Sequence, residues 1–339
     1  MCALAAQVYR GDQIESEHEA DVAVVDNRGE IVAASGNPHR CVFLRSAAKP
    51  LQAVTVINTG AAETFGFDWR DIAILCASHA AGPEHLETVL RVLKKAGLTP
   101  ADLRCGPHWP LDERTQASLR QQGKKPQPLH NNCSGKHAGM LAAALQLGAD
   151  LTTYPEPEHP VQQRNRETIA RLGRVAKEDL WVATDGCGVP TFGVALASAA
   201  WSFLQLAHPE RAPETDRVAL HTIREAMITH PALISQAGHF NTVLMEATKG
   251  NIVAKGGAEG VFCLGVREPG YGIAVKIRDG SGRCLPVVIM EVLKQLGVGG
   301  KGLEKFRVLP VYNTRGEIVG EIRPTLSLRQ FTAKAKGKG

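Results

Sequence analysis

Apolar runs near the two ends of the chain have the short, interrupted pattern that is typical of β-strands. Near the start, "ADVAVVDNRGEIVAASGNP" has one such run on either side of residues 26–29, which predicts a β-hairpin. Near the end, "GYGIAVKIRDGSGRCLPVVIMEVLKQLG" predicts a strand, a turn at residues 279–282 and a helix that ends at Gly297. A third strand is predicted within "GNIVAKGGAEGVFCLGV". Strands therefore open and close the chain.

Between these strands, apolar residues recur with the helical period. In "GPEHLETVLRVLKKAG", Pro83 lies in the first turn and Gly97 ends the helix, and one face is apolar through Leu86, Val89, Leu90 and Leu93. Similar patterns predict helices over residues 134–147, 161–172, 191–206 and 215–227. One antiparallel sheet from both termini with a helical lobe inserted predicts an α+β fold. We expect a single two-lobed domain over residues 1–330, with its site in the cleft between the lobes.

Composition narrows the classes of protein. With 44% hydrophobic and 22% charged residues, the 339-residue chain can form a sizeable core. Residues 331–339 predict a basic disordered tail; it carries part of the net charge of +5, so we expect no nucleic-acid partner. No apolar run approaches the roughly 18 residues of a membrane span, and the N-terminus lacks the basic segment of a secretion signal, which predicts a cytoplasmic protein without a membrane partner. Eight cysteines without a C-x-x-C pair indicate mostly buried free thiols.

The first candidate for chemistry lies in "RSAAKPLQAVTVINTG", where Ser46 and Lys49 are three residues apart at a predicted helix start. On a helix, positions i and i+3 share a face, and the positive end of the helix dipole favours a neutral lysine. Neutral Lys49 could then take the proton of Ser46. The alternative interpretation is a serine that caps the helix with a solvated lysine one turn on.

Two further segments place polar groups at the ends of apolar runs. In "ILCASHAAGPEHL", Ser78 and His79 follow a buried segment, although Ser78 could equally cap the next helix. In "VAKGGAEG", Lys255 ends a strand and the glycines that follow leave the backbone open to a close approach, unless they mark a bulged edge strand. The G-x-x-x-x-G-K-[ST] pattern of a phosphate loop is absent.

Taken in order along the chain, these three motifs resemble the S-x-x-K, S-x-N and K-T-G triplet of the serine β-lactamases and penicillin-binding proteins. Two positions depart from that triplet. Ala80 stands where that family has asparagine, and Gly256 stands where it has a hydroxyl residue that helps to bind the carboxylate of the drug. We therefore expect shared chemistry and a different substrate.

The stretch "HNNCSGKHAGM" admits three interpretations: a helix cap, a metal site, or a cysteine nucleophile with Cys133 beside His137. Together with "RSAAKPLQA", "CASHAAGPEH", "TDGCGVPTF" and "AKGGAEGVF", it makes the chain resemble the rhizobial-type L-asparaginases of the asparaginase II family over nearly its whole length. This resemblance implies a serine β-lactamase-like fold, the hydrolysis of L-asparagine to L-aspartate and ammonia, and a homodimer.

The resemblance also implies roles for particular residues. It places two serine–lysine pairs at Ser46 with Lys49 and at Ser78 with Lys255. It places one Zn²⁺ per subunit on Cys133, Lys136 and Cys187. Two thiolates suit zinc, whereas a lysine must be neutral to bind it. We expect His130 and His137 to support this site or to line the substrate cleft.

The hypothesis for the mechanism is that Ser46 attacks the amide, with Lys49 as its base, while Ser78 and Lys255 relay protons. The backbone N–H groups of Ser46 and Ala258 would bind the oxyanion. Arg45 and Asp185 are the candidates for holding the charged ends of the substrate.

Several alternatives stay open at this point. Ser78 has a lysine partner of its own and could be the nucleophile in place of Ser46. The chain could instead be a glutaminase, a β-lactamase-like serine hydrolase, a cysteine hydrolase, or a non-catalytic zinc-stabilised binding protein.

Overall fold

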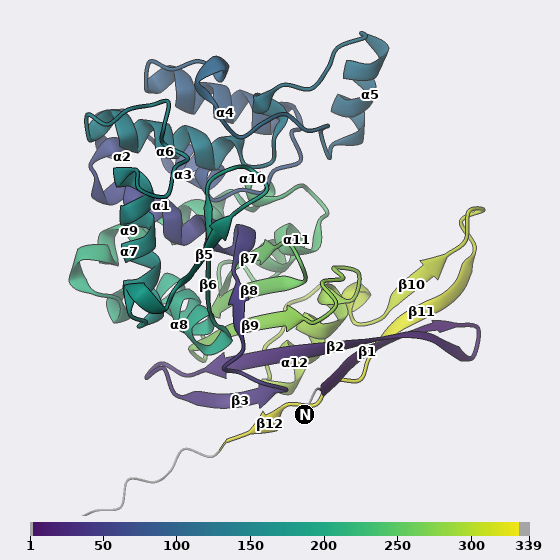
Figure 1. Ribbon diagram of the computed structural model, residues 1–339. Coiled ribbons are helices and arrows are strands. Elements are labelled where there is room, and N and C mark those ends of the chain that lie inside the picture. The colour runs from purple at the N-terminus through teal and green to yellow at the C-terminus, as the bar shows by residue number, and fades with distance from the viewer. Residues whose placement is uncertain (1–2, 332–339) are drawn as a thin grey trace, which may run out of the picture.

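The computed structural model describes residues 3–331. The large sheet combines strands from both ends of the chain, as the sequence predicts (Figure 1). Its strands are β1 (Ala3–Arg10), β2 (Gln13–Val25), β3 (Ile31–Ser35), β7 (Ile252–Gly257), β8 (Val261–Val266), β9 (Tyr271–Ile277), β10 (Leu309–Tyr312), β11 (Ile318–Pro324) and β12 (Arg329–Gln330). The prediction of an α+β fold with a sheet from both termini is confirmed.

All neighbouring strands of this sheet are antiparallel, in the order β10-β11-β1-β2-β9-β8-β7, and β3 pairs with both β2 and β12. The hairpin predicted around residues 26–29 joins β2 to β3. The third predicted strand is two strands, because the turn of residues 258–260 separates β7 from β8. Glu259 and Gly260 both have positive φ there, which reverses the chain direction.

The helical lobe is inserted between β3 and β7 (Figure 1). Its helices are α1 (Lys49–Asn58), α2 (Ala61–Thr64), α3 (Trp69–Leu75), α4 (Pro83–Lys95), α5 (Glu113–Gln121), α6 (Ser134–Gln146), α7 (Pro160–Gly173), α8 (Leu196–Ala207), α9 (Glu214–Thr229), α10 (Pro231–Ile234) and α11 (Phe240–Ala247). The helix α12 (Leu285–Gln295) follows β9 as predicted. A small antiparallel sheet accompanies the lobe, with the order β4 (Cys41–Phe43), β6 (Pro190–Ala195) and β5 (Trp181–Thr184).

The helix predicted over residues 191–206 is partly wrong, since β6 occupies its first part and only α8 is helical. The sequence "TFGVALASAAWSFLQL" is apolar almost throughout, so it fits a buried strand as well as a buried helix. α8 packs against β8 and β9. A Cβ added at Gly272 of β9 would lie 2.0 Å from the Ala200 carbonyl oxygen, so this close packing requires glycine.

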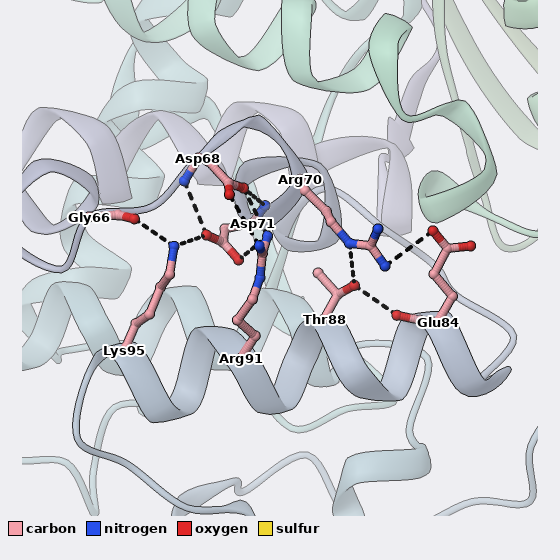
Figure 2. Close-up of polar contacts among 8 residues, drawn as sticks. All are labelled: Gly66, Asp68, Arg70, Asp71, Glu84, Thr88, Arg91 and Lys95. Atoms are coloured by element: carbon pink, nitrogen blue, oxygen red, sulfur yellow. Dashed lines mark hydrogen bonds and ion pairs between the residues drawn. The ribbon is translucent and has the colours of Figure 1, made fainter.

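Charged side chains tie α3 to α4 (Figure 2). Asp68 and Asp71 form a capping box at the start of α3, and the Asp71 carboxylate is fully buried. It accepts a hydrogen bond from Lys95 at 2.7 Å and forms an ion pair with Arg91 at 2.8 Å, both on α4. These ion pairs stabilise the packing of α3 against α4, the helices before and after Ser78 in the chain.

The predicted tail, residues 331–339, lies outside the described residues except for Phe331, whose N–H donates to the Val32 carbonyl. Among residues 3–331, no helix combines the length and the apolar character that crossing a bilayer would require.

Candidate active site

Ser46 lies in a 3₁₀ turn, Arg45–Ala48, between β4 and α1. Arg45 adopts a positive φ of 49°, so the chain bends sharply just before the serine. Ser46 is half-buried, whereas Lys49 begins α1 and is only 1% exposed. Although the i, i+3 spacing also aligns side chains in a 3₁₀ turn, Lys49 Nζ has its partners elsewhere. No hydrogen bond joins Ser46 to Lys49 within the described part of the chain.

Both candidate lysines, Lys49 and Lys255, contact Ser78. Ser78 Oγ lies 3.0 Å from Lys49 Nζ and 2.9 Å from Lys255 Nζ. These residues come from the start of α1, the loop after α3 and the strand β7, so tertiary folding brings them together. The arrangement places one hydroxyl between two buried amines.

Burial shifts the protonation of both amines toward the neutral form. It lowers the pKa of Lys49, and burial together with the nearby Lys49 charge holds the pKa of Lys255 well below its usual range. Lys49 Nζ also donates to the carbonyl oxygens of Ala77 at 2.6 Å and Asn132 at 3.2 Å. A neutral amine has two N–H bonds and one lone pair, so a neutral Lys49 that kept both carbonyl partners would turn its lone pair toward Ser78 Oγ. In that form Lys49 could accept the proton of a hydroxyl.

The backbone around Ser46 offers free hydrogen-bond donors. Within residues 3–331, neither the Ser46 N–H nor the Ala258 N–H donates to another group. A Cβ added at Gly257 would lie 2.5 Å from the Leu44 carbonyl oxygen, so the end of β7 is packed tightly against the Ser46 turn. By contrast, the Ser78 N–H donates to the Ile234 carbonyl at 2.9 Å. An oxyanion hole can thus form beside Ser46 but not with the backbone of Ser78.

Ser46, Ser78 and Lys255 line a cavity of about 470 Å³. Ala258 also lines it, whereas Arg45 and Asp185 are not among its lining residues. Arg45 Nε and Asp185 Oδ1 are 2.7 Å apart. Burial alone would raise the pKa of Asp185, but Lys136 and Arg45 outweigh it and lower that pKa. The pair gives a fixed cation and a fixed anion next to the Ser46 turn.

The three predicted zinc ligands, Cys133, Lys136 and Cys187, lie close together. All three are less than 10% exposed. Lys136 Nζ lies 3.1 Å from Cys187 Sγ. The hydrogen bond between the thiols holds the pKa of Cys133 well below its usual range and raises that of Cys187. Burial opposes the charge on Lys136, but the two sulfurs outweigh it and raise its pKa.

These donors fit a zinc ion chemically, because two sulfurs and one nitrogen converge. The fit requires Lys136 to lose the proton that the two sulfurs favour, because only a neutral amine has a lone pair for a metal. Within residues 3–331 no group of three His, Cys, Asp or Glu side chains converges in a way that would hold a metal.

The two histidines of the same segment have hydrogen bonds away from the cavity. His137 Nδ1 lies 2.6 Å from the Tyr154 hydroxyl, and His130 Nδ1 accepts from the Gln127 N–H at 2.9 Å. Neither residue lines the cavity. Their contacts support the fold of the segment that carries Cys133.

Sequence reasoning missed Asn241 of α11, which is 3% exposed and lines the cavity. Its Nδ2 donates to the Ala254 carbonyl at 3.2 Å, and its Oδ1 accepts from the Gly256 N–H at 2.9 Å. Asn241 therefore forms hydrogen bonds with the backbone on both sides of Lys255. The available signal was an asparagine next to the apolar residues of this helix, since a buried amide needs partners.

A protein family described as L-asparaginase II matches residues 6–324. No curated protein sequence matches the chain. Among solved structures, it is similar to a β-lactamase from Mycobacterium bovis at 15% identity and a TM-score of 0.44, covering 81% of this chain and 94% of that one. A β-lactamase from Sphaerobacter thermophilus gives 14% identity and a TM-score of 0.42, with coverage of 83% and 92%. An octameric penicillin-binding protein homologue from Pyrococcus abyssi gives 12% and 0.44, with coverage of 84% and 75%.

Proposed function

Since the chain belongs to the L-asparaginase II family, we propose that it hydrolyses L-asparagine to L-aspartate and ammonia through a serine acyl-enzyme. One observation carries this proposal: Ser46, Ser78 and Lys255 line the cavity, and a second buried lysine, Lys49, contacts Ser78. A carboxamide is a poor electrophile, so its hydrolysis needs an activated hydroxyl, an oxyanion hole and a proton for the leaving nitrogen. The site contains candidates for each.

Ser46 is our choice of nucleophile, because the free N–H groups of Ser46 and Ala258 can bind the oxyanion that forms next to it. Neutral Lys49 takes the proton of Ser46 when substrate brings the hydroxyl within reach. The proton then passes from Lys49 through Ser78 to Lys255, and from Lys255 to the departing ammonia. The reverse path activates the water that cleaves the ester.

The substrate carries an α-carboxylate and an α-ammonium group. Arg45 binds the carboxylate and Asp185 binds the ammonium, exchanging part of their mutual ion pair for the substrate. Cys133, Lys136 and Cys187 would hold one Zn²⁺ per subunit in a homodimer. When bound, zinc supplies a positive charge that fixes the two cysteine segments beside Asp185.

The test is ammonia release from L-asparagine by the full chain, with L-glutamine and a chromogenic β-lactam as competing substrates, each with and without added Zn²⁺. We expect asparagine to be preferred, and Ser46→Ala to abolish turnover. An aspartyl adduct trapped on Ser78 in the Ser46→Ala protein would overturn the choice of nucleophile. Absence of ammonia release from the metallated wild type would overturn the function, and hydrolysis of the β-lactam alone would replace it.

A further inference from the structure

The candidate active-site cavity is larger than asparagine requires, and one side of it is apolar. Its 470 Å³ falls within the range of about 300–1,000 Å³ that is typical of pockets for drug-sized ligands. Phe240, Phe262 and Leu285 line it, together with Pro286. The Phe240 and Phe262 ring centroids are 5.6 Å apart, and these side chains are 6% and 3% exposed, so packing holds both rings in place.

The direction of the substrate decides which of its groups faces this apolar side. Arg45 and Asp185, which hold the charged ends in the proposed function, do not line the cavity, whereas Lys255 does. Lys255 gives the proton to the leaving nitrogen. The amide nitrogen therefore faces the cavity, and a substituent on that nitrogen would extend toward the two phenylalanine rings.

We propose that the site hydrolyses asparagines whose amide nitrogen carries an apolar substituent, releasing a primary amine in place of ammonia. This inference rests on the proposed function and names a substrate class for the same site. Ser46 Oγ forms an ester with the acyl carbon while the C–N bond breaks, and the amine leaves with the proton from Lys255. Water then cleaves the ester, so L-aspartate β-benzylamide and water give L-aspartate and benzylammonium. An aryl group on the nitrogen is recognised by removal of its surface from water.

The test compares L-asparagine, L-aspartate β-methylamide and L-aspartate β-benzylamide as substrates of the full chain, measured by aspartate release. The methylamide is the matched control, because both derivatives are secondary amides and only one reaches the rings. We expect kcat/KM for the benzylamide to exceed that for the methylamide at least about tenfold, which corresponds to 1.4 kcal/mol.

A substitution at an open lining position can narrow the cavity. Gly282 lines the cavity, and a Cβ there would have nothing within 4 Å. Gly282→Phe should lower the ratio of benzylamide to asparagine kcat/KM at least about tenfold. Gly299 is equally open but does not line the cavity, so Gly299→Phe should leave the ratio unchanged.

The outcomes separate the two proposals. Turnover of asparagine with a benzylamide kcat/KM no higher than that of the methylamide overturns the substrate class and leaves the proposed function standing. Equal ratios in Gly282→Phe and Gly299→Phe overturn the assignment of the benzyl group to this cavity. Hydrolysis of none of the three substrates overturns the proposed function and the substrate class with it.

Discussion

Asn241 provides the sharpest test of how the fold positions the chemistry. It touches neither candidate serine through a hydrogen bond, yet its amide bonds the backbone of β7 at Ala254 and at Gly256, one residue before and one after Lys255. Lys255 Nζ in turn lies 2.9 Å from Ser78 Oγ. If the two hydrogen bonds from Asn241 to β7 set the position of Lys255, removing the Asn241 amide should lower kcat more than it weakens substrate binding.

The expected size follows from the groups left behind by Asn241→Ala. The fully buried Ala254 carbonyl and the half-buried Gly256 N–H lose their side-chain partner, and each such loss costs about 1–3 kcal/mol when the group is buried. We expect the free energy of unfolding to fall by about 2–3 kcal/mol. A displacement of Lys255 by about 1 Å would break its hydrogen bond to Ser78, and a misplacement of that size lowers rates by roughly 100-fold.

The assay is steady-state ammonia release together with urea unfolding. Asn165→Ala is the matched control, because Asn165 is also fully buried and hydrogen-bonded through its amide, but it lies on α7 and does not line the cavity. Both variants should lose stability, whereas only Asn241→Ala should lose kcat, with KM for asparagine changed less than about threefold. A kcat within twofold of that of Asn165→Ala would refute the reasoning, whatever the loss of stability.

The two serines should respond differently to loss of their hydroxyls: Ser46→Ala should abolish the aspartyl adduct seen by intact-protein mass spectrometry, while Ser78→Ala should still form it but about 10²–10⁴-fold more slowly. Burial alone would raise the pKa of Asp21, but hydrogen bonds from the Asn37 N–H and two arginines outweigh burial, so the net shift of this pKa is downward. The stability it contributes is therefore complete above the unfolded value of about 3.9 and lost as pH falls through the lower folded value, so urea unfolding across this range should show a steeper acid loss in wild type than in Asp21→Asn. Asp71→Asn should lower the free energy of unfolding by about 2–3 kcal/mol, because its two cationic partners on α4 lose a charged acceptor (Figure 2), and should leave the kcat of the folded protein unchanged.

The sequence predicted the sheet from both termini because turns at residues 26–29 and 279–282 interrupt clear apolar runs. It failed where local pattern is ambiguous, as in the uniformly apolar stretch that divides into β6 and α8. In the candidate site, too, local motifs identified some residues and missed another. Short motifs singled out Ser78 and Lys255 because reactive side chains stand beside apolar runs. They could not give Asn241, since its partners are backbone groups that only tertiary folding brings within reach.

The expected pairing of Ser46 with Lys49 shows the same limit. The 3₁₀ turn at Ser46 also places i and i+3 on one side, but the spacing could not reveal the tertiary partners of Lys49 Nζ, which lie in the loop after α3 and before α6. Packing of β7 against this turn then decides which side chains meet, and it brings Lys255 to Ser78.

Two amines that share one hydroxyl are electrostatically coupled, and this coupling gives the proposed relay its direction. Lys49 and Lys255 both lie at hydrogen-bonding distance from Ser78 Oγ and are both buried. Two positive charges so close together, away from water, repel strongly, so the pair holds at most one proton at neutral pH. When Lys49 gains the proton of the attacking serine, Lys255 is neutral, so Ser78 can accept a proton from Lys49 and donate its own to Lys255. The arrival of a proton on one side of Ser78 thus favours its delivery on the other, where the leaving nitrogen lies.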